Sequence, residues 1–120
     1  MMEAASRGVT EEGGTVVGIL PGSSRVEGNR YLTVSIPTGM GEMRNALIVR
    51  AADALIAIAG EFGTLSEMAL ALKVGVPVVG LGTWELQKGG KKVDVFLEAS
   101  SPADAVEHAL RLAAERATYR

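Results

Sequence analysis

Apolar residues along the chain follow two spacings, which predict strands and helices in alternation. Short apolar runs rich in Val, Ile and Leu predict strands over residues 15–20, 32–36, 54–59, 77–81 and 93–97, the second of them stopped by Pro37. Apolar residues every three or four positions predict helices over residues 41–52 and 64–74, with Gly75 as the C-cap of the latter. The run 54–59 is apolar on both faces, as is typical of a central parallel strand covered by helices.

Both ends of the chain are predicted to be helical. Residues 1–12 read as a helix that Gly13 and Gly14 close. Near the other end, Ser101 is the expected N-cap and Pro102 the first helical residue, with Asp104 returning a capping-box bond. The alternation predicts one α/β domain over residues 1–120 with a Rossmann-like, doubly wound, mainly parallel sheet in three layers.

Composition narrows the class of protein. The 120 residues are 48% hydrophobic and 22% charged, which is ordinary for a globular domain. The absence of Cys excludes disulfides and thiolate metal sites, and no clustered metal ligands occur. A net charge of −2 gives no reason to expect nucleic-acid binding, and no apolar run is long enough to span a membrane. No basic region followed by an apolar run occurs at the N-terminus, so the sequence does not predict a signal peptide. We therefore expect a cytoplasmic protein.

The candidate site is the turn that follows the apolar strand 54–59. It reads Ala59-Gly60-Glu61-Phe62-Gly63-Thr64 and leads into the helix. In open α/β sheets, ligands bind outside the carboxyl ends of the strands, and glycines there let the backbone approach an anion. Amides at the helix start then hold a phosphate. By itself the pattern is equally compatible with a turn that serves only tight packing.

Two charged residues near this turn have a structural and a functional interpretation. Thr64 through Glu67 matches a capping box, in which Thr64 caps the helix and Glu67 bonds back to it; alternatively Glu67 is a carboxylate at the mouth of the site. Arg44 and its neighbour Asn45 begin the preceding helix. Arg44 is either a solvated surface charge or a guanidinium that grips an anion bound at the turn.

Other polar and aromatic residues receive weaker assignments. His108 is expected on the surface of the last helix without a role, and Lys88, Lys91 and Lys92 are expected in a solvated loop around Gly89 and Gly90. Trp84 follows strand 77–81, where it either stacks on a base or plugs the end of the sheet.

The motifs, in order, resemble the LOG-like family, once labelled "possible lysine decarboxylase", whose hallmark is P-G-G-x-G-T-x-x-E. The likeness includes residues 59–67, the Gly75-Val76-Pro77-Val78 segment, the stretch Gly39 to Asn45, and Met2 to Pro21. Within that family, the chain most resembles the prokaryotic branch related to molybdenum cofactor carrier proteins. No lysine is placed for a pyridoxal Schiff base, so nothing supports decarboxylation.

The resemblance implies a function and roles for the site residues. Members are nucleoside 5′-monophosphate phosphoribohydrolases, usually dimeric and without a required cofactor. The resemblance implies that Glu67 acts on the ribose or on the attacking water, and that Arg44 is the catalytic arginine. It also implies a phosphate-binding turn, which consists of Gly60, Glu61, Phe62, Gly63 and Thr64, with Asn45 as a further binding residue. A nearby carboxylate stabilises the positive charge that builds on the sugar.

The chain departs from the family pattern in two ways. Ala59 replaces the Pro of the motif and Glu61 its second Gly, and a carboxylate at a phosphate site weakens anion binding. Family members also carry strands before the position of Met1, so we expect a truncated chain or a misassigned start, with an open strand edge that favours a homodimer. Three functions stay open: a nucleotide hydrolase, a non-catalytic carrier of a phosphate-bearing pterin such as molybdenum cofactor, and an inactive fragment.

Overall fold

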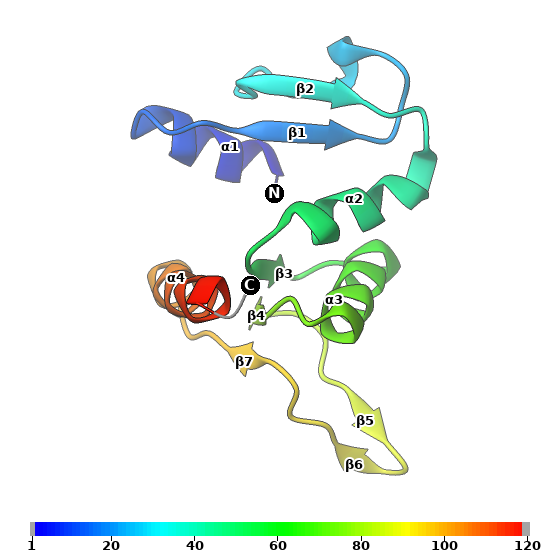
Figure 1. Cartoon of the computed structure of the whole chain (residues 1–120), viewed down its shortest axis with the longest axis vertical. Coiled ribbons are helices and arrows are strands. Elements are labelled where there is room, and N and C mark those ends of the chain that lie inside the picture. Colours follow the sequence, from blue (N-terminus) through cyan, green and yellow to red (C-terminus); the bar gives the residue numbers. More distant parts are fainter. Residues whose placement is uncertain (1, 119–120) are drawn as a thin grey trace. The chain divides into compact units, whose positions relative to one another are not determined.

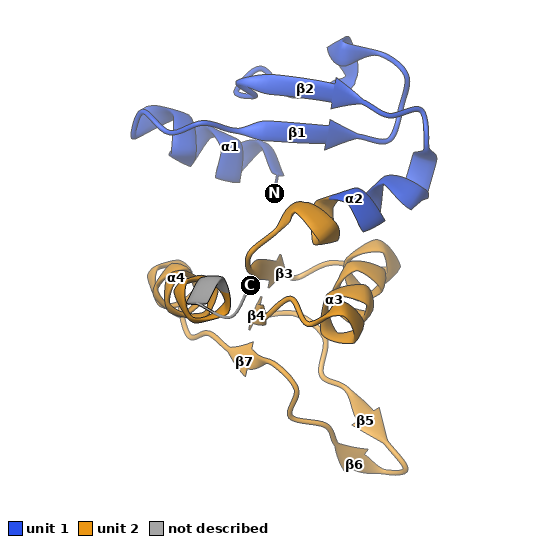
Figure 2. Ribbon diagram, in the orientation of Figure 1, with its two compact units in different colours: residues 1–47 blue, residues 48–120 orange. Residues whose placement is uncertain are grey.

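The computed structural model describes residues 2–118, which form an α/β fold with parallel sheets (Figure 1). The chain divides into two compact units, residues 1–47 and residues 48–120, and each is described by itself (Figure 2). The expectation of one domain over residues 1–120 stays a prediction.

The first unit contains a helix and a two-stranded parallel sheet. Its elements are α1 (Met2–Glu11), β1 (Val17–Leu20), the 3-10 helix η1 (Arg25–Glu27), β2 (Val34–Pro37), the 3-10 helix η2 (Gly41–Met43) and the start of α2 (Arg44–Ala51). Strands β1 and β2 pair in parallel from Val17 opposite Val34 to Leu20 opposite Pro37. The second strand therefore starts two residues later than predicted and includes Pro37, the residue expected to stop it.

The predicted closure of the first helix by two glycines is confirmed. Gly13 takes a left-handed conformation with φ 76°. The Gly13 amide donates to Thr10 O at 3.0 Å, and the Gly14 amide donates to Val9 O at 2.9 Å. This is the hydrogen-bond pattern of a Schellman C-cap, in which glycine avoids the steric cost of the left-handed turn.

The second unit is a three-layer arrangement around a parallel sheet. Its elements are the rest of α2, β3 (Leu55–Ile58), α3 (Phe62–Val74), β4 (Val78–Leu81), β5 (Gln87–Lys88), β6 (Lys91–Lys92), β7 (Leu97–Glu98) and α4 (Pro102–Thr118). The sheet has the strand order β3-β4-β7, all parallel. Helices α3 and α4 lie on opposite sides of β3 and β4 (Figure 1).

The core of this unit is small and aliphatic, as the low aromatic content suggests. Its buried cluster draws on α2, β3, α3, β4 and the connection between α3 and β4, and consists of Val49, Ala57, Met68, Ala71, Val76 and Val78. Gly75, at φ 85°, ends α3 and donates to Ala71 O, which confirms the predicted C-cap. The core thereby fixes both strands that end at the candidate site.

Two expected elements in this unit differ from the structure. Residues 93–96 are not a strand, and β7 pairs only over Leu97 and Glu98. A Cβ built on Gly80 would lie 2.8 Å from Phe96 Cε2, so the ring of Phe96 packs closely over β4 just before the pairing begins. Asp104 does not return its bond to Ser101 but accepts from Ser100 N at 2.9 Å, whereas the Ser101 cap is confirmed by its 3.1 Å bond from Asp104 N.

The single predicted sheet is divided. Within residues 2–118, β1 and β2 pair only with each other, so both are edge strands, and β3 is an edge of the β3-β4-β7 sheet. Unpaired edges favour pairing with another strand. The dimer and the strands expected before Met1 stay predictions.

Candidate functional site

The turn after β3 begins with a strained residue. Ala59 takes φ 47°, and among residues 2–118 it is the one non-glycine residue with a positive φ. Gly60 follows with φ 92°. A left-handed conformation costs an L-residue roughly 1–2 kcal/mol, so other contacts must hold Ala59 in place.

Hydrogen bonds to the neighbouring strand and loop hold the strained residue from both sides. The Ala59 amide donates to Leu81 O at 3.1 Å, at the end of β4. The Thr83 hydroxyl donates to Ala59 O at 2.6 Å and lies 3.7 Å from Sδ of the fully buried Met68. Sequence reasoning missed Thr83, whose position just after the β4 strand end was the available signal. The backbone of the turn is thus braced against β4 and the core.

The helix starts earlier than the sequence predicted. Helix α3 begins at Phe62 with Glu61 as N-cap residue, so Thr64 lies inside the first turn and the predicted Thr64 cap is wrong. The Leu65 amide donates to Glu61 O at 3.1 Å, which closes the first helical turn at Glu61 instead of Thr64. Gly60 packs against Thr64, where an added Cβ would overlap the threonine side chain.

The early start exposes amides that the helix itself does not use. The N–H groups of the first helical residues, Phe62, Gly63 and Thr64, have no acceptor one turn earlier in the helix. The side chain of Glu61 makes no capping hydrogen bond to them. Gly63 is exposed, and nothing lies within 4 Å of a Cβ built on it. This arrangement suits an anion.

Aromatic side chains adjoin the turn. The rings of Phe62 and Trp84 lie 5.7 Å apart with an interplanar angle of 32°. Trp84 Nε1 donates to Glu61 O at 3.1 Å, and its partly buried ring packs against the core cluster. Of the two predicted roles for Trp84, this packing favours the one in which it closes the end of the sheet.

Glu67 lies half-buried in the second turn of α3. Its predicted role at a ribose or a water stays a prediction.

Arg44 and Asn45 are placed in the other unit, at the start of α2. Arg44 Nη1 donates to Ile19 O at 3.0 Å, near the carboxyl end of β1. Arg44 Nε and Asn45 Oδ1 are buried and have no hydrogen-bond partner among the residues that the structure describes. Arg44 is therefore not the solvated surface charge that one interpretation expected. That it reaches an anion at the turn in the second unit stays a prediction.

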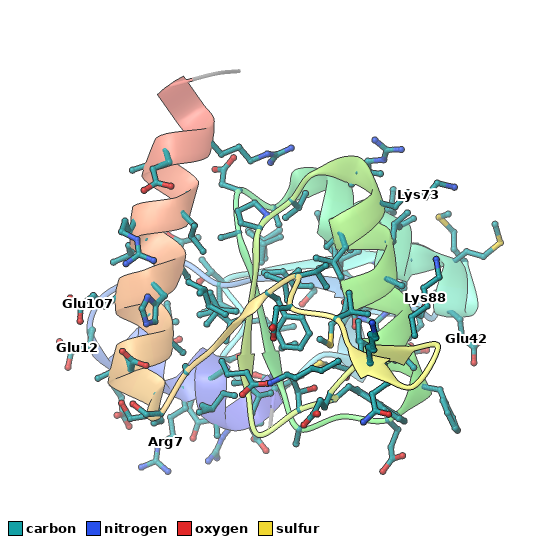
Figure 3. All side chains as sticks on the ribbon, turned by 90° about the horizontal axis from the view of Figure 1, so that it is seen from below. Arg7, Glu12, Glu42, Lys73, Lys88 and Glu107 are labelled. Atoms are coloured by element: carbon teal, nitrogen blue, oxygen red, sulfur yellow. The ribbon has the colours of Figure 1, made fainter. Side chains whose placement is uncertain are left out.

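The residues given weaker assignments mostly behave as expected. Gly89 and Gly90, with φ 59° and 77°, form the two-residue turn of the β5–β6 hairpin. The exposed side chains of Lys73 and Lys88 extend away from the ribbon (Figure 3). Lys92 pairs with Glu98 at 3.2 Å, which raises its pKa through the hydrogen bond. His108 is half-buried rather than on the open surface, with Nε2 3.2 Å from Asp104 Oδ1.

Two classes of feature are absent from the described part of the chain. Residues 2–118 contain no group of three or more His, Asp or Glu side chains that could hold a metal ion. Among the same residues, no helix has the length and apolar character that crossing a membrane requires.

Comparison with known proteins gives consistent matches. Residues 1–109 match the model of the SLOG cluster4 family. An uncharacterized protein of Archaeoglobus fulgidus is 44% identical over 81 residues, which are 68% of this chain and 53% of that protein. The chain thus spans about half the length of this curated relative.

Two solved structures that are similar to this chain are of proteins named for molybdenum cofactor. The molybdenum cofactor binding protein of Rippkaea orientalis is 32% identical with a TM-score of 0.76, over 92% of this chain and 70% of that one. The molybdenum cofactor carrier protein of Chlamydomonas reinhardtii is also 32% identical, with a TM-score of 0.75 over 92% and 69% of the two chains.

Proposed function

Because the chain belongs to the SLOG cluster4 family, we propose that it is a non-catalytic carrier of molybdenum cofactor, a pterin that bears a phosphate. The observation that carries the proposal is the likeness to two structures named for binding or carrying this cofactor, each over 92% of the chain. The SLOG family membership agrees with the LOG-like part of the resemblance, and the two structures named for molybdenum cofactor favour the carrier over the hydrolase.

The turn after β3 supports the phosphate part of this proposal. Its backbone is held by Leu81 and Thr83, and the side chain of the N-cap residue Glu61 makes no capping hydrogen bond to the first amides of α3. A receptor whose donors are fixed before binding loses little conformational freedom when the ligand arrives. Backbone amides also bind an anion at any pH at which the fold is stable. We propose that the phosphate binds at residues 60–64.

In the first unit, Arg44 and Asn45 offer polar atoms that a ligand could also use. The Arg44 guanidinium lies near the end of β1, and its buried Nε has a hydrogen left to donate. Asn45 Oδ1 is an acceptor that a ring N–H or a hydroxyl satisfies. Buried polar atoms without partners are uncommon in proteins, and a bound ligand is one explanation for them.

A phosphoribohydrolase is the second candidate, because the motif carboxylate Glu67 and the motif Arg44 are both retained. The two functions differ in one measurable way. A hydrolase releases a free base and ribose 5-phosphate, whereas a carrier returns its ligand unchanged.

The experiment measures binding and turnover on the same preparation. The protein is equilibrated with molybdenum cofactor under anoxic conditions, and bound molybdenum is counted after dialysis. In parallel it is incubated with a panel of nucleoside 5′-monophosphates. We expect saturable cofactor binding and no release of base. Base release that Glu67→Gln abolishes would overturn the carrier in favour of the hydrolase, and failure to bind any of these ligands would overturn both.

A further inference from the structure

Phe62 is an exposed aromatic residue inside the turn that carries the site. It is the first residue of α3, between Glu61 and Gly63, and its relative exposure is 74%. Isolated exposed apolar side chains are common on protein surfaces. Its place in the turn and its neighbour Trp84 set this one apart.

Trp84 gives Phe62 a fixed support. Its indole N–H is bonded to Glu61 O at 3.1 Å, and its ring is packed on the core. The Phe62 ring lies 5.7 Å away at a tilt of 32°, within the range at which aromatic pairs attract each other. One ring of the pair is therefore anchored, and the other is held beside it while remaining open to solvent.

We propose that Phe62, supported by Trp84, is a stacking platform for the planar heteroaromatic ring of the ligand. The inference rests on the proposed function, since it assumes that the phosphate of the same ligand binds at the first amides of α3. The Phe62 amide is one of those donors, so the ring and phosphate contacts belong to adjacent parts of one turn. A pterin or a purine offers a flat π face of the kind that aromatic side chains bind by stacking.

The test separates the ring from the phosphate by using two probes. Isothermal titration calorimetry measures the Kd of neopterin monophosphate, which has both parts, and of ribose 5-phosphate, which lacks the ring. We expect Phe62→Ala to weaken neopterin monophosphate binding by on the order of tenfold and to leave ribose 5-phosphate binding unchanged. Phe62→Tyr should retain the affinity of the unmodified protein.

The matched control is Leu110→Ala on α4, which removes another side chain with a relative exposure of 67%. It should change neither Kd. Because Trp84 is the only tryptophan of the chain, quenching of its fluorescence by GMP gives a second readout of a ring bound nearby.

The outcomes distinguish this proposal from the proposed function. Equal affinity of Phe62→Ala and the unmodified protein for neopterin monophosphate, with ribose 5-phosphate still bound, overturns the platform alone. A similar loss of both probes in Phe62→Ala also overturns it, because the substitution would then have disturbed the phosphate turn. Failure of the unmodified protein to bind either probe overturns the platform together with the proposed function.

Discussion

Two glycine-to-alanine substitutions in the turn after β3 should have opposite effects on stability. At Gly60, φ is 92°, and an added Cβ would lie 2.2 Å from Thr64 Oγ1 and 2.4 Å from Thr64 Cβ. Thr64 is part of α3, so its Cβ cannot retreat unless the first turn of the helix moves. At Gly63, nothing lies within 4 Å of the added Cβ, and φ is not positive.

The magnitudes follow from these surroundings. In Gly60→Ala the strained backbone costs about 1–3 kcal/mol, and the overlap with Thr64 adds about 1–3 kcal/mol, as overpacking commonly does. The free energy of unfolding should therefore fall by roughly 2–6 kcal/mol, a large share of the stability of a small domain. In Gly63→Ala, the better helix propensity of alanine should raise it by up to about 1 kcal/mol.

Urea denaturation followed by circular dichroism measures both changes, and calorimetry with ribose 5-phosphate then tests the site. If an anion approaches the amide of residue 63, the new methyl group obstructs it, and Gly63→Ala should bind at least about tenfold more weakly while being no less stable. An unfolding free energy of Gly60→Ala equal to that of the unmodified protein would refute the described turn. Undiminished ligand binding by Gly63→Ala would refute the anion site.

Three further predictions concern the bracing of the turn and the start of α4. Ala59→Gly should raise the free energy of unfolding by about 0.5–1 kcal/mol, since glycine takes a φ of 47° without strain; Ala57→Gly in buried β3 is the control and should lower it. Thr83→Val should cost about 1 kcal/mol in urea denaturation because Ala59 O loses its donor, whereas Thr83→Ser should not. The hydrogen bond from the Ser100 backbone N–H is the main cause of the lowered pKa of the Asp104 carboxyl group. The stability that this carboxylate contributes is therefore present above its usual pKa of 3.8 and is lost as the pH falls through the lowered pKa. Acid titration of the unfolding free energy should show this loss in the unmodified protein and not in Asp104→Asn.

The elements that the sequence predicted well are those in which periodicity and end signals agree. The sequence correctly assigned the glycines that end α1 and α3, Gly13 and Gly75, and the start of α4 at Ser101 and Pro102. Each of these signals depends on one residue and its immediate neighbours. The short strand β7 was misplaced because its pairing is decided by β4 and the packing of Phe96 over Gly80. Contacts between segments distant in the sequence leave no periodic pattern.

The candidate site was predicted as a set of residues and not as a geometry. The turn at residues 59–64 could be found because an apolar strand, glycines and a helix occur in order. The positive φ of Ala59 and the hydrogen bond from Thr83 could not be predicted, because both depend on how the loop after β4 folds back on β3. The sequence pattern Thr64 to Glu67 even favoured a wrong helix start, because a capping box depends on backbone angles that the pattern does not contain.

The two departures from the family motif can be understood together from the geometry of the turn. Proline holds φ near −65°, so the proline of the motif could not adopt the φ of 47° that Ala59 has here. With Ala59 and Gly60 both at positive φ, Glu61 becomes the N-cap residue of α3, and its side chain is exposed and makes no capping bond. An exposed carboxylate is screened by water and salt, so its repulsion of a bound phosphate amounts to about 1 kcal/mol or less. At the proposed anion site, Glu61 would therefore weaken binding without occupying the first amides of α3.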